Sequence, residues 1–308
     1  MIVAGTATMA FVALVVFALT FVPTKLTLPA ADPGGLPMAS PPAGMTLSAL
    51  PTGSYDSPAA LTFRGGSWRD TRHLAATAVL VHHPRGNLLI DAGFGRQVDR
   101  HMLLLPFMQR SPHTRETPAL DRLTANGVRS VDIAAIIPTH AHWDHVSGLD
   151  DLRGVPVLET AAGMRFINSG ANGTEVIRSI RGVAYQQYRF EGKSYLGFPR
   201  SHDVWGDGSV VIVPAPGHTP DSVVVFVNLS SGNRYAFIGD VVFQKEGIDR
   251  PAEKPWMLRW LIGEDRGEVD MDIARLRAAK NRYPQIHIIP AHDMSAFQIL
   301  PVFPAFAK

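Results

Sequence analysis

The chain of 308 residues contains no cysteine, and charged residues make up only 18% of it. The absence of cysteine excludes disulfide bonds, thiolate metal ligands and a cysteine nucleophile. Any bound metal ion must therefore be held by histidine, aspartate or glutamate. Apolar residues reach 46%, which is enough to form a substantial core and excludes global disorder.

Clusters of one charge are also absent. The formal net charge is +2, and no stretch carries five or six consecutive lysines or arginines. Nucleic acid is therefore not expected as a partner. A phosphate-binding Gly-rich loop, a Gly-x-Ser-x-Gly motif and a His-Glu-x-x-His motif are missing as well. A small-molecule substrate is the expectation that remains, and the pattern does not predict an oligomeric state.

The N-terminal segment carries no charged side chain from Met1 to Thr24, and residues 9–22 are almost wholly apolar. A helix with a rise of ~1.5 Å per residue and this length can cover the ~30 Å apolar core of a bilayer. We predict that residues 1–24 form a hydrophobic helix that serves as a membrane anchor or a signal segment. A membrane-anchored or exported protein on the extracytoplasmic (periplasmic) side is then expected.

Residues 25–55 are predicted to form a linker, because prolines and glycines recur between residues 31 and 51. Residues 56–308 are predicted to form one catalytic domain, since strand and helix patterns alternate there without a second linker. Apolar runs rich in Val, Ile, Leu and Phe predict strands at 75–82, 87–91, 131–138, 155–158, 209–213, 222–227, 234–238 and 286–289. Helices are predicted at 117–126 and 268–281.

Two short patterns occur twice in the chain. The string Ile-Ile-Pro-Thr-His at 136–140 recurs as Ile-Ile-Pro-Ala-His at 288–292, and the strand that ends at Asp91 is echoed by one that ends at Asp240. The two offsets, 292 − 140 = 152 and 240 − 91 = 149, are nearly equal. This favours two related β-rich halves, which predicts two packed sheets with outer helices.

The segment Thr-His-Ala-His-Trp-Asp-His at 139–145 contains four possible metal ligands within six residues. These side chains cannot share one face of a helix or one face of a strand. Because they directly follow a predicted buried strand, we expect a loop at the edge of the sheet that surrounds more than one cation. Further candidates lie at the ends of other strands or just beyond them: His218, Asp240 and His292.

This combination of His-x-His-x-Asp-His, a later Gly-His, and a strand-end Asp and His resembles the metallo-β-lactamase superfamily over about residues 61–292. The resemblance implies an α+β fold, the αββα sandwich, with the site at one edge. It implies a first metal held by His140, His142 and His218, a second held by Asp144, His145 and His292, and Asp240 as the bridge. It also implies that Asp91 orients a ligand imidazole.

The ligand types favour two Zn²⁺ ions, although two carboxylates also admit Fe or Mn. A hydroxide bridging the metals would attack a carbonyl substrate, and Asp144 would act as the catalytic residue that holds its proton. Asp240 argues against a true β-lactamase, because those enzymes lack the bridging carboxylate. It favours the branch that contains lactonases, thioesterases of the glyoxalase II type and phosphodiesterases. Within that branch, the Gly-His-Thr-Pro context at 217–220 and the compact length most resemble lactonases and general carboxylic-ester hydrolases.

Alternatives remain open within this assignment. A phosphodiesterase or a thioesterase of the same superfamily would use the same ligands, and so would an iron-dependent oxidoreductase. A phosphodiesterase would need cations near the site, and the nearest group, Arg64, Arg69 and Arg72, is expected on the solvated surface. The apolar stripe at 256–261 has two interpretations, either a core-facing helix or the wall of a substrate pocket.

Overall fold

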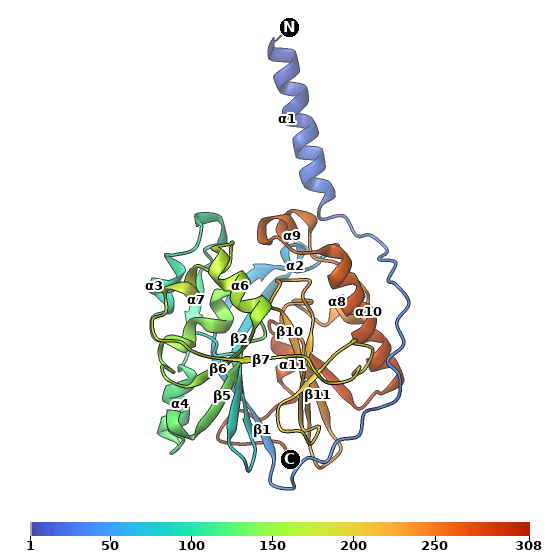
Figure 1. Ribbon diagram of the computed structural model, residues 1–308. Coiled ribbons are helices and arrows are strands. Elements are labelled where there is room, and N and C mark those ends of the chain that lie inside the picture. Colours follow the sequence, from blue (N-terminus) through green and yellow to red (C-terminus); the bar gives the residue numbers. More distant parts are fainter. Residues whose placement is uncertain (1) are drawn as a thin grey trace.

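The computed structural model describes residues 2–308, in which runs of branched apolar residues form the strands of two mixed sheets (Figure 1). The first sheet has the order β4 (His113–Arg115), β1 (Thr46–Pro58), β2 (Thr71–His82), β3 (Asn87–Ile90), β5 (Ile133–Ile137), β6 (Pro156–Thr160) and β7 (Ala184–Tyr188). The second has the order β12 (Ile286–Ile289), β11 (Arg234–Phe237), β10 (Val223–Asn228), β9 (Val210–Pro214) and β8 (His202–Asp203).

The two sheets pack face to face, and helices cover their outer sides. Val79 and Val81 from the first sheet share one buried cluster with Val225 and Val227 from the second. The outer side of the first sheet is covered by α3 (Val98–Met102), α4 (Ala119–Ala125), α6 (Ala161–Ser169) and α7 (Glu175–Ser179). The outer side of the second is covered by α8 (Glu246–Asp249) and α10 (Arg266–Arg282). The predicted αββα sandwich is confirmed.

The repeated patterns lie on equivalent strand pairs. In the first sheet β3 runs parallel to β5, with Ile90 opposite Ile137. In the second sheet β11 runs parallel to β12, with Phe237 opposite Ile289. Because parallel strands end at the same edge, each pair places the residues that follow its two strands next to one another. The functional residues of both halves therefore meet at one edge of the sandwich.

The short elements complete the chain and lie mainly near the two edges of the sheets. They are α2 (Ala59–Thr62), α5 (Trp143–Val146), α9 (Trp256–Ile262), α11 (Met294–Phe297), and the 3₁₀ turns η1 (Phe107–Gln109), η2 (Ser130–Asp132) and η3 (Ser147–Asp150). Most predicted strands were found within one or two residues of their expected ends. The helix expected at 268–281 begins at Arg266, because the Asp265 side chain accepts a hydrogen bond from the backbone N–H of Glu268 at 3.1 Å.

The linker predicted for residues 25–55 is wrong from residue 46 onward. Residues 46–55 belong to β1, which lies between β2 and β4 and buries Leu47 and Leu50. The proline and glycine that suggested a linker sit at an irregularity of the strand, where the register shifts between Pro51 and Gly53. A Cβ on Gly53 would lie 2.4 Å from Cδ2 of Phe94, so glycine is needed there for close packing.

The N-terminal segment forms the helix α1 (Ile2–Leu19), which projects from the end of the sandwich near α2 and α9 (Figure 1). The helix ends before Thr24, and Thr20 and Phe21 are buried against the domain. Within the described part of the chain, no helix has the length and apolar character required to cross a membrane. The cellular location stays a prediction.

Candidate metal centre

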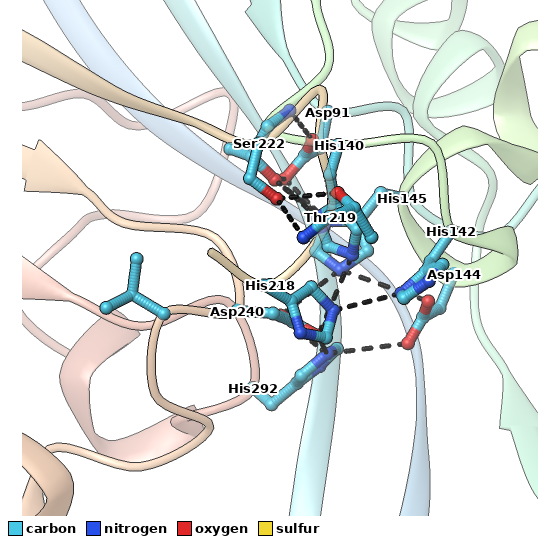
Figure 2. A network of polar contacts seen from close by, with 12 residues as sticks. Asp91, His140, His142, Asp144, His145, His218, Thr219, Ser222, Asp240 and His292 are labelled. Atoms are coloured by element: carbon cyan, nitrogen blue, oxygen red, sulfur yellow. Dashed lines mark hydrogen bonds and ion pairs between the residues drawn. The ribbon is translucent and has the colours of Figure 1, made fainter. Parts of the chain in front are cut away.

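Seven predicted ligands lie together at the edge where β3, β5, β11 and β12 end (Figure 2). Their ligand atoms form two groups, each within 4.8 Å: His140, His142, His218 and Asp240 in the first, and Asp144, His145 and His292 in the second. Six of the seven side chains are buried, and His142 is partly exposed. The division matches the two metal sites that the sequence motif implied.

The loop after β5 turns sharply because α5 begins inside the ligand motif. The backbone N–H groups of His145 and Val146 both donate to the carbonyl of His142, at 3.0 and 3.1 Å. This single helical turn directs Asp144 and His145 toward the second group, while His140 and His142 remain with the first. The predicted loop is thus partly helical, and the turn explains how four ligands in six residues serve two sites.

Asp240 lies between the two groups and faces both. Its Oδ2 atom is 3.4 Å from Nε2 of His218 and 3.8 Å from Nε2 of His140, in the first group. Its Oδ1 atom is 3.0 Å from Nε2 of His292 and 3.4 Å from Nε2 of His145, in the second group. Its Oδ2 atom also lies 3.2 Å from Nε2 of His292. The carboxylate therefore contacts imidazoles of both groups, which is the arrangement a bridging ligand requires.

The outer nitrogen of three ligand imidazoles is held by a fixed partner. Nδ1 of His145 is 2.9 Å from Oδ2 of Asp91, and Nδ1 of His292 is 2.8 Å from the carbonyl oxygen of Ala75. Nδ1 of His218 is 3.0 Å from Oε2 of Glu264. These contacts place a proton on Nδ1 and direct Nε2 toward the centre, in the tautomer that binds a metal.

The ring of His142 is fixed by its contacts with His218 and Gly173. Its Nδ1 atom lies 3.0 Å from Nε2 of His218, and its ring packs against the backbone of Gly173. A Cβ on Gly173 would come within 2.3 Å of the imidazole ring, and the residue has a φ of +90°. Glycine is therefore required here on two grounds.

The electrostatics match a site for cations. Burial lowers the pKa of His140 and His142 well below the ordinary value, with the neighbouring histidines adding to the effect. Burial acts in the same direction on His145, but the carboxylates of Asp91, Asp240 and Asp144 outweigh it and raise its pKa. The carboxylates thus attract a positive charge to the centre. Metal ions would supply that charge.

Unpartnered atoms support the same conclusion. Nε2 of His140, Nε2 of His145 and Oδ1 of Asp240 are buried and have no hydrogen-bond partner among the described residues. Buried polar atoms without partners are costly, so groups of them that face one another indicate a missing ligand. Nitrogen and carboxylate oxygen donors without thiolates are suited to Zn²⁺ and also to Fe or Mn. The residues present therefore fit two metal ions.

Three further residues of the site had no signal in the sequence. Nζ of Lys254 contacts Oε2 of Glu264 and lies 3.4 Å from Nδ1 of His218, so a buried ion pair supports the first group. The hydroxyl of Tyr55 donates to Oδ2 of Asp144 at 3.0 Å, beside the second group. Lys254 and Glu264 flank α9, and Tyr55 lies in the segment that was taken for a linker.

A cavity of about 230 Å³ opens beside the seven ligands. Its walls include Leu105 and Trp143 on one side and Met257, Leu258 and Leu261 of α9 on the other. Met257 and Leu261 of the stripe at 256–261 therefore line the pocket, in keeping with the second interpretation, whereas Trp256 and Trp260 are exposed. No lysine or arginine lines the cavity among the described residues. Arg64, expected on the surface, is instead largely buried in an ion pair with Glu253.

Comparison with known proteins agrees with this geometry. The family model described as the metallo-beta-lactamase superfamily matches residues 71–290, which is more than half of the chain. The chain therefore belongs to the metallo-β-lactamase superfamily, and it is a metal-dependent hydrolase with a His/Asp metal site.

Its curated relatives include a probable metallo-hydrolase of Mycobacterium tuberculosis, 27% identical over 246 residues, with 73% of this chain and 77% of the relative covered. A probable metallo-hydrolase of Bacillus subtilis is 32% identical over 127 residues, with 38% of this chain and 52% of the relative covered.

Similar solved structures include an N-acyl homoserine lactone hydrolase with N-hexanoyl-L-homoserine bound at its metal centre. Its TM-score is 0.67 at 17% identity, covering 88% of this chain and 100% of that chain. A dizinc quorum-quenching lactonase has a TM-score of 0.52 at 16% identity, covering 92% of each chain. At these identities the likeness shows the fold.

Proposed function

We propose that this protein uses two zinc ions to hydrolyse a lactone or a simple carboxylic ester. The observation that carries the proposal is the cavity, which joins the paired ligand groups to an apolar wall without a lining cation. A carbonyl substrate needs only a polar reaction centre and an apolar surface for its acyl part. The lactone hydrolases among the structural neighbours add support.

The seven candidate ligands would have different roles according to their positions. His140, His142 and His218 would hold the first ion, Asp144, His145 and His292 the second, and Asp240 both. When bound, the two ions supply an activated water molecule and polarise the carbonyl of the substrate. Asp144 stands at the cavity, with its Oδ2 atom fixed by the Tyr55 hydroxyl, and would accept the proton that the attacking water loses.

The apolar wall would hold the acyl part of the substrate. Met257, Leu258 and Leu261 face the cavity from α9, and Trp143 and Leu105 face it from the other side. These side chains exclude water from the reaction centre, which strengthens the electrostatic interactions there. Their aliphatic and aromatic surfaces would contact the acyl group by van der Waals interactions, so selectivity would depend on the size and shape of that group.

The test is a substrate panel on one preparation loaded with zinc. An acyl lactone, an aryl carboxylic ester, a thioester and a bis-aryl phosphodiester are compared by kcat/KM. We expect the lactone or the ester to react fastest, because phosphodiester oxygens find no cation on the cavity wall.

The Asp144→Asn variant is the control, and it should lose turnover while circular dichroism shows an intact fold. Preferred hydrolysis of the phosphodiester, without turnover of lactone or ester, would overturn the proposal in favour of a phosphodiesterase. Iron in protein purified without added metal, together with dioxygen consumption, would instead favour an oxidoreductase.

A further inference from the structure

Exposed apolar side chains surround the mouth of the cavity on two sides. They comprise an apolar rim, defined as Leu103, Leu104, Phe107 and Met108 after α3 together with Trp256 and Trp260 of α9. Phe107 is 83% exposed, and Trp260 is 79% exposed. Met108 reaches the cavity lining, as do the neighbours of Trp260 on α9. The rim is therefore continuous with the apolar wall of the cavity.

The helix α1 is fixed to this same end of the molecule. The backbone N–H of Met257 in α9 donates to Oγ1 of Thr20, directly after α1, at 3.1 Å. The guanidinium of Arg64 donates to the carbonyl of Leu19 at 3.0 Å and is held by Glu253 at 2.6 Å. Figure 1 shows α1 leaving the sandwich beside α2 and α9. The rim and α1 consequently belong to one face.

The exposed side chains of α1 indicate what this face contacts. In its second half seven large apolar side chains are exposed, at least 40% in each case: Phe11, Val12, Leu14, Val15, Val16, Phe17 and Leu19. At 100° per residue these positions cover all sides of the helix. A protein partner would cover one stripe, whereas a helix that is apolar on every side is matched by lipid. Exposed tryptophans beside it are typical of a lipid–water boundary.

We propose that the apolar rim and α1 together dock on a phospholipid bilayer, with the mouth of the cavity facing the lipid. Docking requires α1 and the rim to enter the apolar phase from one side, and it does not require α1 to cross the bilayer. Given the function proposed above, the substrate is then an amphiphilic ester or lactone whose acyl chain partitions into the membrane. It would enter the cavity between Met108 and Leu261 without passing through water.

The absence of cysteine makes this surface directly testable, because a single introduced cysteine can be labelled without background. Full-length Phe107→Cys and Trp260→Cys proteins are labelled with an environment-sensitive fluorophore and mixed with phosphatidylcholine vesicles. We expect a blue shift of the emission and quenching by brominated lipid. Val131→Cys is the matched control: Val131 is 76% exposed but lies in η2, before β5, at the strand end away from the ligands.

Three outcomes would overturn the proposal. Vesicle-bound protein whose label at Phe107 stays unquenched would show that α1 holds the domain away from the lipid. Equal quenching at Val131 would show binding without orientation. A blue shift on concentrating the protein without vesicles would assign the face to a second copy of the chain.

Activity separates this proposal from the function on which it partly rests. The double variant Phe107→Asp/Trp260→Asp should retain hydrolysis of a short water-soluble ester but lose several-fold activity on a long-chain ester embedded in vesicles. Both side chains lie outside the cavity lining. Unchanged activity on the embedded ester would reject the lipid surface alone. Lipid contact without hydrolysis of any ester would reject the proposed function and leave the surface standing.

Discussion

The two parallel strand pairs carry the same pattern of residues but use it differently. Each pair supplies an Asp after one strand and a His after the other: Asp91 and His140 in the first sheet, Asp240 and His292 in the second. Asp91 accepts hydrogen bonds from the backbone N–H of Thr139 at 2.6 Å and from Nδ1 of His145 at 2.9 Å. Asp240 faces imidazole Nε2 atoms of both ligand groups.

The difference shows that the hydrogen-bond donors around a strand-end carboxylate determine whether its oxygens can bind a metal. Donors on the outer side of the ligand rings occupy the oxygens of Asp91, so it can only orient a ligand. The Oδ1 atom of Asp240 has no hydrogen-bond partner among the described residues and remains available at the centre. One local pattern has produced a hydrogen-bond acceptor for a histidine in one sheet and a candidate bridging ligand in the other.

The largest expected effect comes from removing the bridging carboxylate. Asp240→Ala should lose at least one of about two metal equivalents, because both groups lose the charge that offsets their dications. Metal content measured by mass spectrometry after dialysis checks this, and turnover should fall with the metal. Asp240→Asn is the matched variant, since it keeps the volume but removes the charge. Equal metal content in the wild type and both variants would reject the bridging role.

Asp91→Asn should have the second largest effect. The amide oxygen can still accept from Thr139, but the hydrogen bond that holds Nδ1 of His145 is lost or reversed. Partners of this kind are worth about 10–100-fold in metal affinity. A competitive chelator titration should therefore show a weaker second site with an unchanged first site. Weakening of both sites to the same extent would mean that Asp91 supports the fold and not one ligand.

Glu264→Gln tests the matching contact of the first group. The variant loses the charge that faces Nδ1 of His218 and leaves Lys254 in a buried place without its carboxylate. We expect about tenfold weaker metal binding at the first site, which is the lower end of the range of about 10–100-fold for such partners. The effect is small because the amide oxygen can still accept a hydrogen bond. The same titration measures it. A loss confined to the second site would contradict the assignment of His218 to the first.

The sequence located the residues of the two candidate ligand groups because these residues follow strongly patterned strands. His140, Asp240 and His292 each come shortly after a buried apolar strand, so the position of the strand located the ligand. Asp91 was found through the repeat. The strand β1 was missed because Pro51 and Gly53, which accommodate its irregularity, resemble linker residues.

The supporting residues could not be predicted, because their roles arise only in three dimensions. Lys254 and Glu264 meet across the ends of α9, and Tyr55 reaches Asp144 from 89 positions away along the chain. Gly173 is fixed by the ring of His142, which lies on a different element. None of these contacts leaves a local periodicity or a short motif. Long-range packing therefore sets the limit of what the sequence alone could indicate.

Glu159 is a further buried carboxylate, and its hydrogen-bond partner is Thr160 instead of a histidine. Glu159 is 6% exposed, and burial, with the nearby Asp221 adding to it, raises its pKa from 4.5 to about 8. The folded state therefore binds the proton more tightly than the unfolded state does. The resulting stability is fully present below pH 4.5 and is lost as the pH rises to about 8.

Glu159→Gln should remove this dependence, because the amide stays neutral and its oxygen can still accept from the N–H of Thr160, now 2.7 Å from Oε1. Relative to the wild type, the variant should gain stability between pH 5 and pH 8, by at most about 1.4 kcal/mol for each pH unit. Urea unfolding of both zinc-loaded proteins at several pH values measures the difference, with the exposed Glu116→Gln as control. Parallel stability curves for wild type and Glu159→Gln would show that the carboxyl is ionised in the fold. Its environment would then resemble that of Asp240, whose pKa is lowered because the neighbouring histidines outweigh the effect of burial.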